Sequence, residues 1–222
     1  MGTPGQAIVR AIIAGERDPA VLARHHNKRL KASAEEVRRA LTGNWREEHL
    51  FLLGQALAIY DDFGRRIEEC DARIETLLAP LLRHAVTLKA APQSKAKHHP
   101  TFDARQSLAN WAGVDLTRID GLGVSAVMKL LAEIGTDLSH FASVKHFCSW
   151  LGLCPGTKIS GGKVLSARTK RSAHRARQVL KLAAMSLARS DSALGAFYRR
   201  LCTRMDKPRA NTAVAHKLAR MV

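Results

Sequence analysis

The sequence has few aromatic residues, no long apolar run and no closely spaced pair of cysteines. Aromatic residues make up 5% of the chain, too few for a base-stacking platform to be its main surface. No apolar run approaches the ~18–20 residues that a membrane span needs, and the first residues lack the charged and apolar regions of a secretion signal. The four dispersed cysteines include no Cys-x-x-Cys pair, which argues against a disulfide framework or a zinc site and fits reduced thiols in the cytoplasm.

Acidic residues are also scarce, above all in the last third of the chain. The whole sequence has 36 Lys and Arg against 19 Asp and Glu, a net charge of +17. Residues 157–222 hold 16 of these cations and only two acids, Asp191 and Asp206, so this segment alone carries +14. A basic excess concentrated in one segment is typical of a surface that binds a polyanion, and nucleic acid is the first candidate. A solvated basic face without a partner is the alternative.

Residues 1–45 are expected to form short helices. Asp18 and Pro19 are a typical helix cap and first helical residue, and Ser33 with Glu36 forms a capping box that opens a further helix. The stretch resembles the small helical motifs that pack beside DNA-binding domains. Simple scaffolding is the alternative.

Residues 46–90 are expected to form a coiled-coil helix. Apolar residues recur at alternating steps of three and four, which is the seam of a coiled coil: Leu53, Ala56, Tyr60, Phe63, Ile67, Cys70, Ile74, Leu77 and Leu81. The pattern predicts an arm through which the protein forms a homo-oligomer. A long helix buried along its own domain fits equally well, since Gly54 and Gly64 weaken the helix and leave its register open.

Residues 91–104 are expected to be a linker, because prolines, small polar residues and lysines lack any apolar period there. The adjacent His98 and His99 have no further ligands at a suitable spacing, so no metal site is predicted. Residues 105–222 are expected to complete an all-α protein. The helical pattern continues to Val222 without a stop signal, which predicts that the chain is a fragment.

The first candidate functional motif contains two glycines. Gly121 and Gly123 allow a tight turn before an apolar helix, similar to the hairpin of helix-hairpin-helix DNA-binding modules. In such a turn, backbone N–H groups approach a phosphate without obstruction by side chains. A packed turn between two helices is the alternative.

The second candidate functional motif surrounds Ser160, which is followed by two glycines and flanked by Lys158 and Lys163. The glycines let the backbone approach a substrate closely, and the lysines would neutralise phosphate charge. A serine hydroxyl is a poor nucleophile unless a base or a metal activates it, and the spacing does not place His174 within reach. The residues therefore predict a phosphate-facing loop, with an ordinary turn as the alternative.

The third candidate functional motif is a basic helical run that begins at Ser166 and precedes an apolar helix. Its candidate DNA-binding residues are Arg168, Lys170, Arg171 and Arg175. The later helices also combine an apolar face with an arginine and lysine face, a pattern that phosphate contact explains.

Together these motifs resemble one family of DNA-rearranging enzymes. The segments that carry the resemblance are Ile119-Asp120-Gly121-Leu122-Gly123, Leu131-Ala132-Glu133-Ile134-Gly135, Lys145-His146-Phe147, Ser149-Trp150-Leu151-Gly152-Leu153-Cys154-Pro155-Gly156, Ser160-Gly161-Gly162-Lys163, Ser192-Ala193-Leu194-Gly195-Ala196-Phe197-Tyr198 and Ala213-Val214-Ala215-His216-Lys217-Leu218-Ala219-Arg220. The chain is similar to the transposases of the insertion-sequence one-ten family, most closely to its eleven-eleven subgroup. That family includes the Piv-type DNA invertases. The similarity is strongest from about residue 115 onward.

The resemblance implies a C-terminal helical transposase domain in which the serine of a Ser-Gly motif, here Ser160, is the covalent nucleophile on DNA. It implies DNA as partner, an element-encoded guide RNA as a further partner, and the nucleoid of the bacterial cytoplasm as location. The family's Mg²⁺ is bound by four carboxylates of an N-terminal RuvC-like domain.

The sequence departs from that family pattern at its start, because the acids ahead of residue 46 lack the strand context of a RuvC-like domain. We therefore expect no cofactor in this chain itself and a transposase fragment that is inactive alone, so that its status as an enzyme stays open. The alternatives are a non-catalytic remnant that binds nucleic acid and a structural coiled-coil adaptor.

Overall fold

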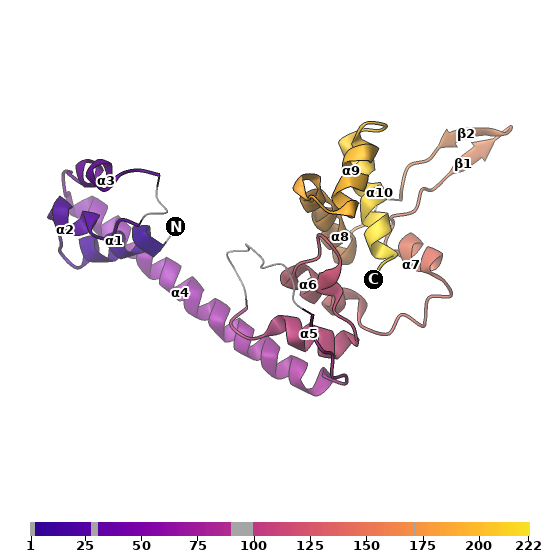
Figure 1. Cartoon of the computed structure of the whole chain (residues 1–222), viewed down its shortest axis with the longest axis horizontal. Coiled ribbons are helices and arrows are strands. Elements are labelled where there is room, and N and C mark those ends of the chain that lie inside the picture. Colours follow the sequence, from indigo (N-terminus) through magenta and orange to yellow (C-terminus); the bar gives the residue numbers. More distant parts are fainter. Residues whose placement is uncertain (1–2, 28–30, 90–99, 171) are drawn as a thin grey trace. The chain divides into compact units, whose positions relative to one another are not determined.

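The computed structural model describes residues 3–27, 31–89, 100–170 and 172–222 (Figure 1). Helices dominate these residues, and their strands form a single two-stranded sheet. The mainly α-helical fold that the sequence predicts is confirmed. The chain divides into two units, residues 1–70 and 71–222. Among the described helices, none combines the length and the apolar character needed to span a membrane.

The first unit contains three short helices, α1 (Thr3–Ile13), α2 (Pro19–Ala23) and α3 (Ala34–Ala40), and the first part of α4 (Glu47–Leu78). The predicted caps are confirmed. The Asp18 carboxylate accepts a hydrogen bond from the Ala20 N–H at 2.8 Å, and both hydrogen bonds of the Ser33 and Glu36 capping box are present. Helix α1 is joined to α4 by an ion pair between Arg10 and Asp61.

The long helix predicted after residue 46 is α4, which is 32 residues long. It ends at Leu78 and is followed by a 3₁₀ helix, Ala79–Leu81, so the helix is shorter than the expected 46–90 segment. Ion pairs join Asp62 to Arg65 and Arg66 along its surface. Four residues of the predicted seam are at least half exposed: Tyr60, Phe63, Ile67 and Leu77. Their pairing with a second helix stays a prediction.

The second unit is built around α8 (Arg175–Ser186), which packs against α6 (Val124–Ile134) on one side and α10 (Lys207–Ala219) on another. The remaining helices are α5 (Ala104–Ala112), α7 (Val144–Trp150), α9 (Ala193–Cys202) and two short 3₁₀ helices, Leu116–Arg118 and Leu187–Arg189. The core includes the fully buried side chains of Leu108, Leu122, Leu130, Leu151, Leu180, Leu187, Val214 and Leu218. This core holds the ends of α6, α7 and α8 in fixed positions.

The structure corrects two expectations for this unit. The helix predicted from Ser166 begins only at Arg175, because residues 163–166 form a strand and residues 167–170 and 172–174 are not helical. Helix α10 ends at Ala219 instead of continuing to the last residue. Of the predicted linker, residues 91–99 lie outside the described residues, and Ala104 already belongs to α5.

Candidate nucleic-acid site

Ser160 lies at the end of a β-hairpin, where the sequence predicted a loop. Strands β1 (Lys158–Ser160) and β2 (Lys163–Ser166) are antiparallel, and Ser160 is directly opposite Lys163. The two residues between them, Gly161 and Gly162, have φ values of 53° and 73°. A two-residue hairpin loop with two positive φ angles is the turn that Gly-Gly forms without strain. The glycines are therefore required by the turn.

The hairpin brings two of the predicted site residues onto one face. Directly opposed residues of paired strands share a face and neighbours along a strand alternate, so Ser160 and Lys163 lie on one face and Ile159 and Val164 lie on the other. The register shifts between Lys158 and Ile159, and Lys158 is opposite Ser166. All of these residues except Ser166 are exposed. Within the described residues, the Ser160 hydroxyl has no hydrogen-bond partner, so it is free to meet a substrate.

Residues 167–174, which we name the return segment, lead from β2 to α8. At the base of the hairpin, the Gly156 N–H donates a hydrogen bond to the Arg168 carbonyl at 2.9 Å, and Pro155 forms a β-bridge with Thr169. The predicted DNA-binding side chains of Arg168 and Lys170 are both exposed here. Arg171 lies outside the described residues.

Arg177 fixes the return segment to α8. Its guanidinium donates hydrogen bonds to the carbonyls of Lys170 and Ser172 and to the Thr169 hydroxyl, at 3.2, 3.3 and 3.4 Å. The sequence suggested that Arg177 was one more cation of a basic helical run. Its contacts instead make it a structural residue that holds Lys170 in place.

The hairpin, the return segment and the helices that hold them lie in a part of the chain that is similar to a known family. Residues 115–199 match the Transposase IS116/IS110/IS902 family. The comparison with curated proteins found no match. The family match includes α6, α7, the hairpin and α8, and it supports a transposase-type function that acts on DNA.

The two glycines at the start of the transposase match have different surroundings. Gly121 has a φ of 90°, and a Cβ at this position would lie 2.9 Å from the Ala183 carbonyl oxygen of α8. Close packing against α8 thus explains this glycine without DNA. Gly123 is the exposed N-cap of α6, and no atom lies within 4 Å of the position that a Cβ would occupy. A 3₁₀ helix precedes the turn, and the helix-hairpin-helix interpretation stays a prediction.

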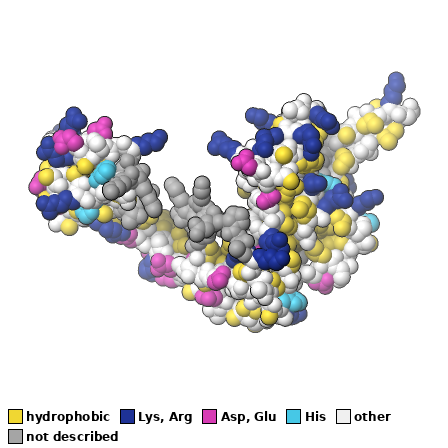
Figure 2. Space-filling model, in the orientation of Figure 1, with side chains coloured by type: hydrophobic (Ala, Val, Ile, Leu, Met, Phe, Trp, Pro, Cys, Tyr) yellow, Lys and Arg dark blue, Asp and Glu magenta, His cyan; other side chains and the backbone are white. Residues whose placement is uncertain are grey.

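Basic side chains surround the hairpin and the helices behind it. Figure 2 shows that Lys and Arg outnumber Asp and Glu on the visible face of this unit. Within the described part of the chain, the side chains of Lys158, Lys163, Arg168 and Lys170 have no ion pair or hydrogen bond. Some other late cations have protein partners, since Arg199 donates to the Ser190 carbonyl at 2.6 Å, whereas the side chains of Lys181 of α8 and Arg200 of α9 also have none within the described residues. The hairpin and the return segment therefore carry four of the unpaired cations of this unit.

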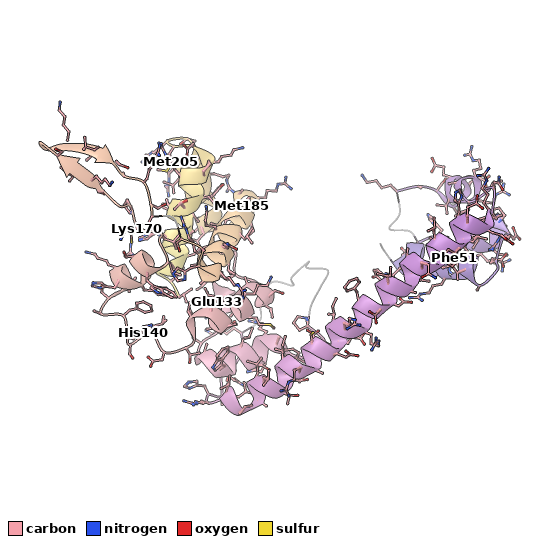
Figure 3. All side chains as sticks on the ribbon, turned by 180° about the vertical axis from the view of Figure 1, so that it is seen from behind. Phe51, Glu133, His140, Lys170, Met185 and Met205 are labelled. Atoms are coloured by element: carbon pink, nitrogen blue, oxygen red, sulfur yellow. The ribbon has the colours of Figure 1, made fainter. Side chains whose placement is uncertain are left out.

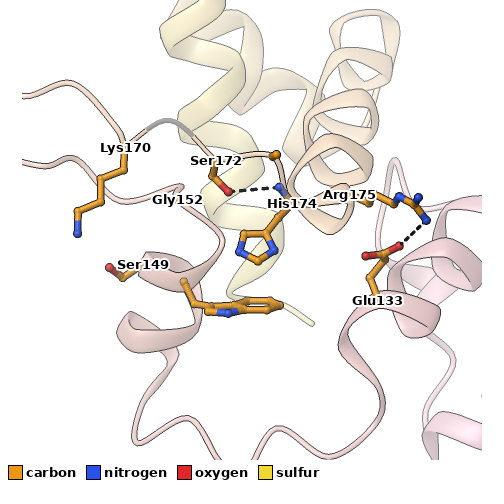
Figure 4. A pocket seen from close by; sticks show the side chains of 9 residues that line it. Glu133, Ser149, Gly152, Lys170, Ser172, His174 and Arg175 are labelled. Carbon is orange, nitrogen blue, oxygen red and sulfur yellow. Dashed lines mark hydrogen bonds and ion pairs between the residues drawn. The ribbon is translucent and has the colours of Figure 1, made fainter.

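A cavity of about 550 Å³ opens beside the return segment (Figure 4). The lining residues are Glu133, Ser149, Trp150, Gly152, Lys170, Ser172, Ala173, His174 and Arg175. Glu133 comes from α6 and Lys170 from the return segment (Figure 3). The sequence predicted Lys170 and Arg175 as site residues. It did not predict Trp150 or His174, because their proximity depends on the fold.

The residues described do not fit the Mg²⁺ that the family resemblance implies. Nowhere in the ranges that the structure describes do three or more His, Cys, Asp or Glu side chains form a group that could hold a metal ion. The buried carboxylate of Asp115 is occupied by Arg105, at 2.5 Å, and by the Thr117 hydroxyl, at 2.6 Å. It therefore has a structural role.

Proposed function

We propose that this protein is a transposase-type recombinase polypeptide in which Ser160 is the nucleophile that attacks a DNA phosphodiester. The position of Ser160 on an exposed hairpin, opposite Lys163, is the observation that carries the proposal. A DNA backbone can reach an exposed hydroxyl on a hairpin without any change in the protein. The match of residues 115–199 to a transposase family supports DNA as the substrate.

The proposed step exchanges one phosphate ester for another. The Ser160 hydroxyl gives its proton to solvent, and its Oγ forms a bond to phosphorus. The bond between phosphorus and one deoxyribose oxygen breaks, and that oxygen takes up a proton and becomes a free hydroxyl end. The product is a phosphoserine link to the other DNA end. Because the number of phosphate ester bonds is unchanged, the link can be reversed during strand exchange.

The lysines on the hairpin would hold the attacked phosphate. Lys163 lies directly across from Ser160, and Lys158 is two residues before Ser160 on the same strand. Cross-strand neighbours have Cβ atoms ~4.5–5.5 Å apart, so an ammonium group can reach a phosphate at the Ser160 hydroxyl. The charges would stabilise the extra negative charge that develops during attack. Arg168, Lys170 and Arg175 would extend this contact along the DNA backbone without reading its sequence.

Three further parts of the proposal come from the family resemblance and from the sequence pattern. The protein would belong to the eleven-eleven subgroup, related to the Piv-type invertases. It would form a homo-oligomer through the exposed seam of α4, and it would act at the bacterial nucleoid with an element-encoded guide RNA. The charge of residues 157–222 supports a nucleic-acid partner of either kind.

A covalent-adduct assay tests the nucleophile. The full chain is incubated with end-labelled DNA, and adducts that resist denaturation are counted for the wild type, Ser160→Ala and Ser166→Ala. Ser166 is the matched control because it is the other serine of the same hairpin. The chain alone is not expected to complete transposition, but the single attack by Ser160 should give adducts from the wild type and Ser166→Ala and none from Ser160→Ala. An adduct that survives in Ser160→Ala would overturn the assignment.

A non-catalytic nucleic-acid-binding role is the second candidate. It is favoured by the lack of a hydrogen-bonded base at Ser160 within the described residues. DNA retention that weakens with salt, together with no adduct from any variant, would support this second role.

A further inference from the structure

The cavity beside the return segment combines aromatic rings, hydroxyl groups and cations. Its volume of about 550 Å³ falls in the ~300–1,000 Å³ range of small-ligand sites. Trp150 and His174 both line it, with ring centroids 4.3 Å apart. Lys170 and Ser149 lie on one side of the His174 ring, and Arg175 lies on the other (Figure 4). Aromatic rings flanked by cations match the two halves of a nucleotide, its base and its phosphates.

The Trp150 ring is held rigidly but remains accessible. Its centroid is 5.4 Å from that of Phe141 and 6.3 Å from that of Phe147, yet the residue is 41% exposed. Three aromatic residues of the chain, Phe141, Phe147 and Trp150, meet here, and every ring–ring contact within the described residues belongs to this cluster. A rigid, partly exposed indole loses little side-chain entropy when a base stacks on it.

The cations of the cavity are available to a ligand. Arg175 has a side chain that is 81% exposed, and its ion pair with Glu133 is 3.5 Å long, so little free energy is lost when the guanidinium turns to a phosphate. Lys170 has no ion pair within the described residues, and Arg177 fixes its backbone carbonyl. The wall that carries Lys170 is therefore set before a ligand arrives.

We propose that this cavity binds a single unpaired nucleotide of the DNA substrate. The base would pack against Trp150 and His174, and the adjoining phosphates would contact Lys170 and Arg175. This inference rests on the proposed function, since it takes DNA as the ligand. A chain that joins strands must handle DNA that is locally unpaired, and unstacking a base is cheapest where it is already unpaired. The cavity would select such positions, whereas the hairpin lysines would bind any backbone.

The test compares two duplexes that differ by one extrahelical thymine. Fluorescence anisotropy at ~0.15 M salt measures the affinity of the full chain for the paired duplex and for the duplex with the extra base. Stacking of one base on an aromatic side chain contributes ~1–3 kcal/mol, so we expect the wild type to prefer the extra base by about ten-fold. Trp150→Leu should remove this preference and leave the affinity for the paired duplex unchanged.

Two further variants distinguish the loss of the pocket from a loss of the folded structure. Ser149→Leu fills the cavity from an exposed position of α7 and leaves the aromatic cluster intact, so it should also abolish the preference. Trp45→Leu is the control, because Trp45 belongs to the first unit, and it should retain the preference.

The outcomes separate this inference from the proposed function. Binding of both duplexes with equal affinity by the wild type overturns the nucleotide pocket and leaves the DNA-acting function standing. A preference that survives in both Trp150→Leu and Ser149→Leu also overturns the pocket. Failure to bind either duplex contradicts the proposed function itself.

Discussion

Arg177 donates hydrogen bonds to the backbone carbonyls of Lys170 and Ser172, at 3.2 and 3.3 Å. One side chain of α8 thus holds the return segment, and with it one wall of the aromatic cavity. Arg168 lies on the same segment, but its side chain is exposed and has no partner within the described residues. The two arginines therefore have different roles, although both are part of the basic sequence run.

Substitution of each arginine by glutamine separates these roles. Arg168→Gln should weaken DNA binding and reduce the slope of log affinity against log salt by about one, because one phosphate contact is lost. Its free energy of unfolding should change by less than ~0.5 kcal/mol. Arg177→Gln should instead lower the free energy of unfolding by ~1–3 kcal/mol, since two backbone carbonyls lose hydrogen bonds from a charged donor. Salt titrations and urea unfolding measure the two effects, and a reversed pattern would contradict the assignment.

Local patterns allowed much of the fold to be predicted from the sequence. The Ser33 and Glu36 capping box and the Asp18 cap formed as expected, because both depend on neighbours within three residues. The hairpin was missed although Gly161 and Gly162 stand between Ile159 and Val164, which is a hairpin signal. Its strands of three and four residues are exposed on both faces, so no apolar alternation marked them.

The parts of the site that depend on tertiary contacts could not be predicted from the sequence pattern. Arg177 has the same local sequence character as Arg175, and only the position of the return segment makes it structural. Trp150 and His174 are 24 positions apart in the chain. They meet because α7 ends and α8 begins at the same cavity. Ser160 was predicted to lie in a loop and lies instead in strand β1 beside the turn, and its chemistry stays a prediction.

Gly152 is predicted to be required at the end of α7. Its φ is 69°, and an added Cβ would lie 2.8 Å from the Cβ of Ser172. Gly152→Ala should therefore lower the free energy of unfolding by ~1–3 kcal/mol, from backbone strain and from the contact. The double variant with Ser172→Gly should recover part of this loss, because it removes the contacting Cβ. Urea unfolding of the single and double variants gives the coupling free energy between positions 152 and 172. If the two changes in unfolding free energy simply add, the contact is unimportant.

The ion pair between Asp115 and Arg105 predicts a pH-dependent contribution to stability. Burial raises the pKa of Asp115, but hydrogen bonds from Thr117 and Arg105 outweigh it, so that the net pKa is lowered. A lowered pKa means that the stabilisation is present above the ordinary Asp pKa of about 3.9 and is lost as the pH falls through the folded value. Asp115→Asn should cost ~2–3 kcal/mol at pH 7, since it leaves Arg105 without its counter-charge.

Urea unfolding between pH 7 and pH 3 tests this expectation for Asp115. The difference in unfolding free energy between wild type and Asp115→Asn should be largest at pH 7. It should shrink below about pH 4, where the Asp115 carboxylate of the unfolded wild-type chain begins to take up a proton. A difference that stays constant over this range would show that the charge of Asp115 does not stabilise the fold.

Gly54 is predicted to weaken α4 without a compensating contact. No atom lies within 4 Å of the position that a Cβ would occupy, and the residue lies one position beyond Leu53 of the predicted seam. Gly54→Ala should raise the free energy of unfolding by ~0.5–1 kcal/mol, because alanine restricts the unfolded chain and favours the helix. The thermal transition of the helical circular dichroism signal measures this change. A lower transition temperature would indicate that another chain packs closely at Gly54.

Two phenylalanines of α4 test the predicted seam. Phe63 is 62% exposed and belongs to the seam, whereas Phe51 is 67% exposed (Figure 3) and lies outside it. If α4 pairs with a second copy through the seam, Phe63→Glu places a charge in the interface and should abolish self-association, because a buried unpaired charge is strongly unfavourable. Phe51→Glu adds the same charge at an equally exposed position and should leave the oligomeric state unchanged. Sedimentation velocity measures the oligomeric state of both variants. An equal effect of the two substitutions on the oligomeric state would show that α4 does not associate through this seam.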